Sequence, residues 1–374
     1  MNFLFEYSEF YAILNRFVRE NCSLKQLKYL GGKKKIMEIL KGIVLLLLVL
    51  VGFTAFSLKM PKGMKAMGAL AGAATASFLV EAFHFYVGGD LFGITILRDL
   101  GAASGGMGGV AAATLVALAL GSSPVYAILI GCAVSGFGIL PGFFAGYVLG
   151  FILPKMEEKI PDGIDLIAVI VIAAPLARLV AIGADPLVNA TLINIGKIIT
   201  QATAQSPTIM AIILGGVITV VATAPLSSMA LTAMLGLTGL PMAIGALAVM
   251  GSSFMNGVFF HKIFKDKSTT IAVAVEPLTQ ADLISANPIP VYCTNFVGGA
   301  ISGLIVTHFN LINNAAGTAT PIAGLMVMYG FNSPLKVTMA ASLCAVSGLT
   351  IGYIGSLIFK NFKIKSVAEV RGTV

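Results

Sequence analysis

The chain is a succession of apolar runs between residues 36 and 360, and its charged residues gather between those runs. The runs cover residues 36–58, 68–88, 107–121, 124–153, 164–184, 207–223, 240–260, 291–311, 319–331 and 335–359. Most approach the ~20 residues that a helix needs to cross the hydrocarbon core. Only 11% of the 374 residues are charged, against ~25% in soluble domains. These features predict an all-α polytopic membrane protein.

Two apolar segments are interrupted by proline and glycine and are too broken for ordinary spans. They are APLSSMALTAMLGLTGLP (224–241) and IAVAVEPLTQADLISANPIP (271–290). Paired, interrupted hydrophobic segments are the best pointer in a sequence to a transport site built from half-helices. We therefore expect two re-entrant hairpins and about ten transmembrane helices.

The remaining segments give the predicted domain organisation. Residues 185–206 place Leu187, Leu192, Ile195 and Ile199 on one helical face, which is typical of an amphipathic helix in the membrane interface. Residues 1–35 are predicted to form an N-terminal amphipathic, interfacial segment. Residues 36–360 form one membrane domain, and 361–374 a short cytoplasmic tail.

The net charge of +8 comes largely from lysines next to apolar runs. Clusters at 33–35, 262–267 and 360–365 are typical of cytoplasmic turns. Lysines at 59, 62 and 65 also follow the first run, so the orientation stays open. The basic residues form no folded basic module, which argues against nucleic-acid binding.

Glu276 is the strongest candidate for a binding residue. A carboxylate at membrane depth is costly and usually faces a cavity, a partner or a substrate. It could bind solute hydroxyls, or it could be a structural carboxylate held by a half-helix N-terminus. Four polar residues on the same interrupted segment are predicted to share its site: Thr279, Gln280, Asp282 and Asn287.

A second candidate pair is Glu81 and His84, which are three residues apart and so share a helix face. They could bind a proton or a solute, or could satisfy each other inside the bundle. Asp90, Arg98 and Asp99 are expected to make a local ion pair. The chain contains no GxxxxGK[ST] loop, and no Cys or His spacing of a metal site. No cofactor, metal site or catalytic residue is predicted.

The order of four motifs resembles the membrane permease (EIIC) component of the phosphoenolpyruvate-dependent sugar phosphotransferase system. The motifs are GSSPVYAILIGCAVSGFGILPGFFAGYVLGFI (121–152), GADPLVNATLINIGKII (183–199), APLSSMALTAML (224–235) and the Glu276 segment. The resemblance is closest to the fructose type and to a stand-alone EIIC-like group that includes the perfringolysin O regulatory protein.

The resemblance implies a ten-span homodimer in the bacterial inner membrane, with a sugar held between the two hairpins. By position it assigns Pro225 and Ser227 to the first hairpin turn and Glu276 to the acidic sugar-binding position. Ser227 stands where the fructose pattern has Asn, and NNAAGTATPIAG (313–324) replaces a histidine-containing loop. Phosphoryl transfer would require separate EIIA and EIIB proteins, since the chain carries neither module.

Three functional hypotheses follow from these residues. The first is an EIIC-type permease that binds and translocates a sugar or sugar-like solute between the hairpins. Any enzymatic role would be that of the membrane subunit of a phosphotransferase. The second is a membrane sensor that keeps the solute site without robust transport. The third is an ion-coupled carrier that uses Glu81 and His84.

Overall fold

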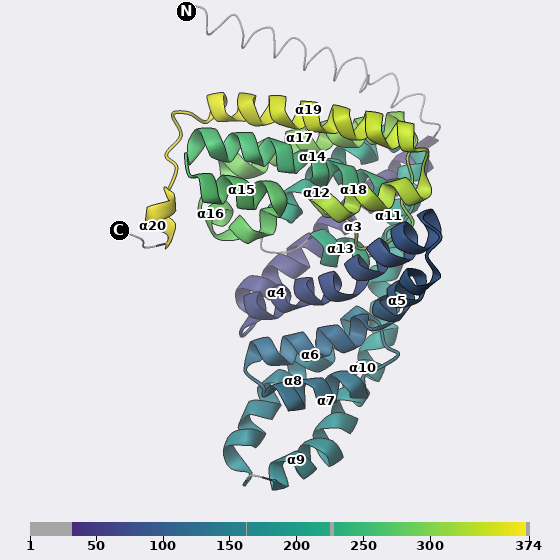
Figure 1. Cartoon of the computed structure of the whole chain (residues 1–374), viewed down its shortest axis with the longest axis vertical. Coiled ribbons are helices and arrows are strands. Elements are labelled where there is room, and N and C mark those ends of the chain that lie inside the picture. Colours follow the sequence, from purple (N-terminus) through teal and green to yellow (C-terminus); the bar gives the residue numbers. More distant parts are fainter. Residues whose placement is uncertain (1–31, 162, 225–227, 372–374) are drawn as a thin grey trace, which may run out of the picture.

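The computed structural model describes residues 32–161, 163–224 and 228–371, and these residues are helical with no strand among them. Figure 1 shows one group of helices at the bottom and a second at the top. The all-α prediction is confirmed. The N-terminal segment 1–31, Pro225 and Ser227 lie outside the described residues.

The N-terminal half holds α3 and the lower group. Its elements are α3 (Gly32–Lys59), α4 (Gly63–Ala74), η1 (Thr75–Leu79), η2 (Ala82–Leu91), α5 (Thr95–Gly106), α6 (Gly108–Leu120), α7 (Pro124–Ala133), α8 (Ile139–Lys159), α9 (Ile164–Ala168), η3 (Val169–Ala173), α10 (Ala174–Val188), η4 (Asn189–Ile193) and α11 (Asn194–Gln205). The apolar run 124–153 is two helices, α7 and α8. The chain turns between them at Gly136, whose φ of 88° favours glycine.

The C-terminal half forms the upper group. Its elements are α12 (Pro207–Thr223), α13 (Ser228–Met234), α14 (Leu240–Ile263), α15 (Lys267–Val275), η5 (Pro277–Gln280), α16 (Ala281–Ala286), α17 (Pro288–His308), α18 (Pro321–Phe331), α19 (Pro334–Ile358) and α20 (Val367–Arg371). Five of these helices begin with proline at the first or second position, where its missing N–H costs no hydrogen bond.

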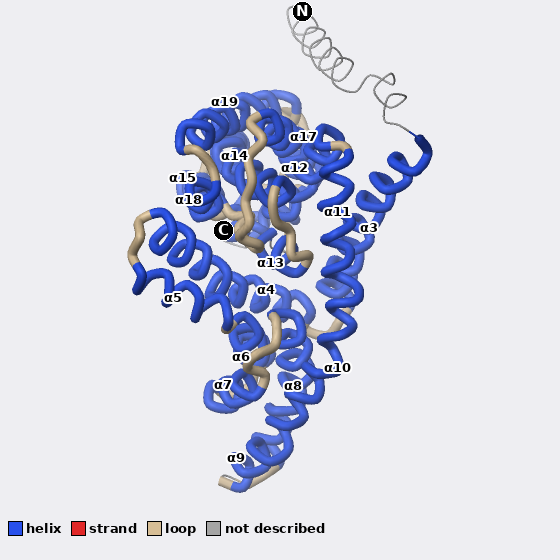
Figure 2. Tube along the Cα trace, turned by 90° about the vertical axis from the view of Figure 1, so that its right-hand side faces the viewer, coloured by secondary structure: helices blue, strands red, loops and turns tan. Residues whose placement is uncertain are grey.

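One helical run of 42 residues, Ile164–Gln205, joins the two groups. Figure 2 shows α10 continuing into α11, which lies beside α3. The predicted amphipathic helix at 185–206 is the upper part of this run, and its place in the interface stays a prediction. At ~1.5 Å per residue the run is about twice the thickness of a hydrocarbon core, so part of it must extend past the core or tilt strongly.

Among the described residues, seven helices are long and apolar enough to cross a membrane, or eight if α5 and α6 form one span bent by 55°. The chain is therefore a multi-pass membrane protein. Three further apolar helices, α7, α12 and α18, are shorter than a full span. The expected total of ten spans remains a prediction.

Glycine brings the helices of each group into close contact. A Cβ on Gly142 of α8 would lie 2.1 Å from the carbonyl oxygen of Gly109 on α6. A Cβ on Gly348 of α19 would lie 2.3 Å from the carbonyl oxygen of Gly251 on α14. Both distances are far below van der Waals contact, so any side chain would separate these helices.

Candidate functional site

The Glu276 segment is a helix, a break and a second short helix. Asp266 caps α15, where its carboxylate accepts a hydrogen bond from the Thr269 N–H at 2.7 Å. The helix ends at Glu276, which is extended (φ −147°, ψ 101°) because a residue that precedes proline is disfavoured in the α conformation. After Pro277, η5 and α16 continue to Asn287, where α17 begins.

The Glu276 side chain is half-buried and faces the start of α18. Its Oε2 accepts a hydrogen bond from the Thr320 hydroxyl at 3.2 Å. Thr320 is buried and stands at the N-cap of α18, whose macrodipole is positive at this end. Sequence reasoning did not select Thr320, although its position directly before Pro321 is a helix-start signal that could have identified it.

The loop that carries Thr320 is ordered by one buried amide. The Asn313 side chain donates to the Thr318 hydroxyl and accepts from the Ala315 N–H, both at 2.9 Å. The Asn313 N–H in turn donates to the carbonyl of Gly239 at 3.0 Å. This loop is therefore attached to the chain segment between α13 and α14.

A second bond joins the same loop to α13. The buried Ser228 hydroxyl donates to the carbonyl of Ala319 at 2.6 Å. Figure 1 shows α13 directly below α18. Three segments that are far apart in sequence thus meet at Glu276 and Thr320: the α13 segment, the α15–α16 segment and the loop before α18.

The meeting point lies beside the middle of α14. A Cβ on Gly257 would lie 3.5 Å from the Cβ of Ala274, two residues before Glu276. A Cβ on Gly245 would lie 3.6 Å from the Cβ of Ala319, one residue before Thr320. Since α14 runs from Leu240 to Ile263, the Glu276–Thr320 pair lies between these two levels, near half its length.

A cavity of about 620 Å³ opens next to this pair, among α14, α15, α18 and α19. Its wall includes Ala274 and Pro321, the neighbours of Glu276 and Thr320. Most of the lining is apolar, with Met250, Phe254 and Leu325 among its larger residues. Its polar side chains are Ser253, Tyr329, Thr338 and Ser342, and Glu276 and Thr320 adjoin the wall without lining it.

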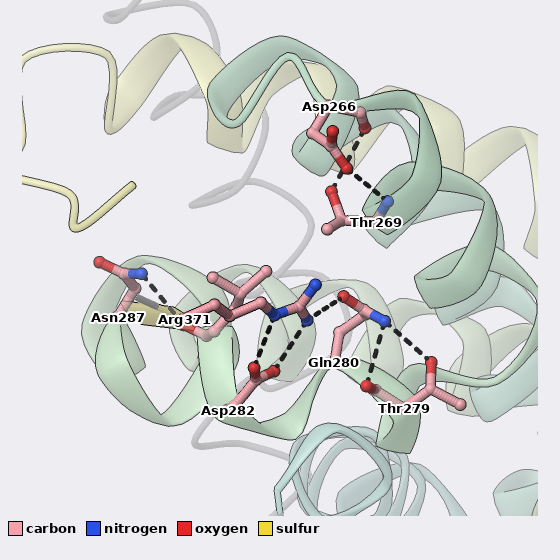
Figure 3. Close-up of polar contacts among 8 residues, drawn as sticks. Asp266, Thr269, Thr279, Gln280, Asp282, Asn287 and Arg371 are labelled. Atoms are coloured by element: carbon pink, nitrogen blue, oxygen red, sulfur yellow. Dashed lines mark hydrogen bonds and ion pairs between the residues drawn. The ribbon is translucent and has the colours of Figure 1, made fainter. Parts of the chain in front are cut away.

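The other predicted residues of this segment contact the C-terminal part of the chain. Figure 3 shows Gln280 and Asp282 converging on Arg371, which no motif had indicated. The hydrogen bonds that Arg371 donates hold the pKa of the Asp282 carboxyl below its ordinary value and raise that of Arg371. The buried Asn287 side chain bonds the backbone of Lys365. Only Thr279 stays next to Glu276, where its hydroxyl donates to the Glu276 carbonyl at 2.8 Å.

Glu81 and His84 lie at the start of η2, which packs against α18 and against Ala315 of the loop that carries Thr320. The Glu81 carboxylate lies against Gly105 of α5, since a Cβ there would be 2.2 Å from Oε2. The His84 ring packs edge-on against Phe83. The expected local ion pair joins Arg98 to Asp90 at 3.5 Å. A π-helix such as η2 is often found at functional sites, so the pair remains a candidate.

No cluster of three or more metal-binding side chains occurs in the described part of the chain. The polar groups at Glu276 are one carboxylate and two hydroxyls, which suit hydrogen bonding to a hydroxylated solute.

A comparison with protein families matches residues 64–370 to the phosphotransferase system EIIC model. The chain belongs to the phosphotransferase system EIIC family. The match includes α13, the Glu276 segment and the loop before α18, so the meeting point described above lies within the EIIC domain. At the level of the family, this supports a sugar permease of the membrane. A comparison with curated proteins gives no match.

Proposed function

We propose that this EIIC protein binds one sugar or sugar-like solute at Glu276, between segments 224–241 and 271–290, and carries it across the membrane. The observation that supports this most strongly is the Glu276–Thr320 hydrogen bond beside the middle of α14. A carboxylate accepts hydrogen bonds from sugar hydroxyls through both oxygens. Near the middle of a span, such a carboxylate is costly unless it has this kind of partner.

The directions of the short segments favour the half-helix architecture. The loop before α18 is attached beside Gly239, at the start of α14, and reaches the level of Gly245 at Ala319. Helix α15 begins after the other end of α14 and reaches the level of Gly257 at Ala274. The loop is bonded to Ser228 and Gly239 of segment 224–241, and α15 belongs to segment 271–290. Both approach the same point from opposite ends of one span, which supports a site built from half-helices.

In this proposal the solute site moves as a unit between the two membrane faces. With α7, α12 and α18 counted as spans, the seven candidates become ten, or eleven if α5 and α6 also form one bent span; the resemblance implies ten. We also propose a homodimer in the bacterial inner membrane, a permease similar to the fructose type, and phosphoryl transfer by separate EIIA and EIIB proteins.

Two substitutions separate the charge of Glu276 from its hydrogen bond. Glu276→Gln keeps an acceptor for Thr320 but removes the charge, and we expect it to abolish solute binding while the protein stays folded. Thr320→Val keeps the charge but removes the donor, and we expect weaker binding. Glu158→Gln, an exposed carboxylate on α8, is the matched control and should bind normally.

The measurement is a thermal-shift screen of the purified protein against sugars, sugar acids and polyols, followed by uptake into vesicles. Unchanged affinity in Glu276→Gln would place the solute elsewhere. Binding without uptake would favour the sensor hypothesis. Uptake that depends on pH and is lost in Glu81→Gln would favour the ion-coupled carrier.

A further inference from the structure

The C-terminal residues 365–371 dock on the segment that follows Glu276. Arg371 holds its guanidinium over two side chains of that segment. Its Nε donates to Asp282 Oδ2 at 2.8 Å, and one terminal nitrogen donates to Asp282 Oδ1 at 3.1 Å and to Gln280 Oε1 at 2.7 Å (Figure 3). This is a fork of charge-assisted bonds, which only a planar guanidinium can make.

Lys365, the first of the docked C-terminal residues 365–371, is held by a second side chain, that of Asn287. The Asn287 amide donates to the carbonyl of Lys365 at 3.1 Å and accepts from its N–H at 2.8 Å. The Asn287 amide thus pairs with both backbone polar groups of Lys365, the N–H and the carbonyl. Asn287 is 4% exposed, and its bonds to the exposed Lys365 are half-buried.

Between these two points the chain folds into α20 by a local signal. Ser366 and Glu369 form a capping box: the Glu369 carboxylate accepts from the Ser366 N–H at 2.6 Å, and Ser366 Oγ accepts from the Glu369 N–H at 3.3 Å. The resulting turn packs Val367 and Val370 against a buried cluster that includes Leu283 and Ile284 of α16. The docked state is therefore encoded by polar contacts at both ends and apolar packing in between.

The docked segment reaches Glu276 through two residues. Gln280, whose Oε1 accepts from Arg371, donates its Nε2 to the carbonyl and hydroxyl of Thr279 at 3.0 and 3.2 Å. The Thr279 hydroxyl donates to the carbonyl of Glu276 at 2.8 Å. A continuous series of hydrogen bonds therefore links Arg371 to the backbone of Glu276, the residue proposed to bind the solute.

We propose that residues 365–371 are a clasp that holds η5 and α16 in place, and that Arg371 is a positioning residue for Glu276. With the clasp docked, the Glu276 backbone is fixed and its carboxylate faces Thr320. With the clasp released, η5 and α16 lose their contacts to Arg371 and Lys365, and the carboxylate loses its fixed direction. The part of this inference that concerns solute affinity rests on the proposed function; the part that concerns the position of Glu276 does not.

The experiment uses the purified full-length protein and needs no solute. Hydrogen–deuterium exchange followed by mass spectrometry reports on η5 and α16, and the rate of carbodiimide labelling reports on the Glu276 carboxylate. We expect Arg371→Ala, which removes three hydrogen bonds, to raise the exchange rate of η5 and α16 at least about tenfold, the effect of losing one charge-assisted hydrogen bond. In the same variant, the carbodiimide labelling rate of Glu276 should also differ from that of the wild-type protein.

Two variants distinguish positioning from a general loss of charge. Arg371→Lys keeps the charge without the fork, so both rates should fall between wild type and Arg371→Ala. Lys360→Ala removes a charge from the same part of the chain, and its described hydrogen bond is made by the backbone, so both rates should match wild type. Wild-type rates for Glu276 in Arg371→Ala would overturn the proposal, as would an equal effect of Lys360→Ala.

A final measurement links the clasp to the solute. With a sugar that binds the wild-type protein, Arg371→Ala should raise the KM of uptake and leave its maximal rate nearly unchanged. If Arg371→Ala alters the labelling of Glu276 but leaves the KM of uptake unchanged, the result would support the clasp and contradict the proposed solute site at Glu276.

Discussion

Two asparagines join the helices that follow the two interrupted segments, and their removal offers the sharpest test of the packing. Asn256 on α14 and Asn295 on α17 are 1% and 0% exposed. Each donates its amide to the oxygen of the other, at 3.1 and 2.9 Å. Since α14 follows α13 and α17 follows α16, this pair fixes the relative position of the two segments.

Asn295→Leu removes both of these interhelical bonds, and also the bond that the Asn295 amide donates to the Val291 carbonyl of its own helix at 2.9 Å. It leaves the Asn256 amide buried without its partner. Interhelical hydrogen bonds in membrane proteins contribute about 0.6 kcal/mol on average and at most about 1.7 kcal/mol. Two lost bonds should therefore lower the free energy of unfolding by about 1–3 kcal/mol. Leucine and asparagine are similar in size, so the packing term should be small.

The double variant Asn256→Leu/Asn295→Leu should recover much of this loss, because no buried amide is then unpaired. The assay is reversible unfolding in mixed detergent micelles, analysed as a double-mutant cycle. Asn194→Leu is the control, since Asn194 is exposed and bonds only the Ala190 carbonyl of its own helical run. Simple addition of the two single-variant effects would refute the interhelical pair.

Two further predictions concern helix contact and pH. Gly299→Ala should destabilise the protein by about 1–3 kcal/mol in the same assay, because the new Cβ would lie 2.2 Å from the Gly215 carbonyl oxygen; Gly52→Ala, with no atom within 4 Å, should be neutral. Acid should release the clasp. The folded pKa of Asp282 is depressed below its usual 3.8, so its contribution to docking is present above that value and is lost as pH falls through the folded pKa. A spin label on Ala368→Cys should gain mobility in that window, and docking that persists to lower pH would contradict the role of the Asp282 carboxylate.

The sequence was sufficient to predict the class of the fold and the break in the Glu276 segment. Long apolar runs dictate helices in lipid, and Pro277 after Glu276 predicts the break that the structure contains. The break in run 124–153 lies at Gly136 and not at Pro141, because proline fits the first turn of α8. These signals are local, so they can be recognised in a short window of sequence.

The partners of the site residues could not be predicted in the same way. Thr320 and Glu276 are 44 residues apart, and Arg371 and Asp282 are 89 apart. No periodicity connects positions at such separations, so polar residues of one segment appeared to share one role. Their contacts in the structure differ: Glu276 and Thr279 lie at the meeting point, while Gln280, Asp282 and Asn287 contact residues 365–371.

The packing of α14 and α19 gives the site a predicted orientation. Gly348 and Gly352 of α19 lie against Gly251 and Met255 of α14, so the two helices run parallel and end on the same side. The lysines at 262–267 and 360–365 follow these ends, and basic turns favour the cytoplasmic side. The clasp follows α19 directly, so it should face the cytoplasm. Soluble EIIA or EIIB proteins would arrive from that side, and we therefore expect a docked partner to alter hydrogen exchange in α20 before it alters exchange in α13. The reverse order, measured with purified phosphocarrier proteins, would contradict this orientation.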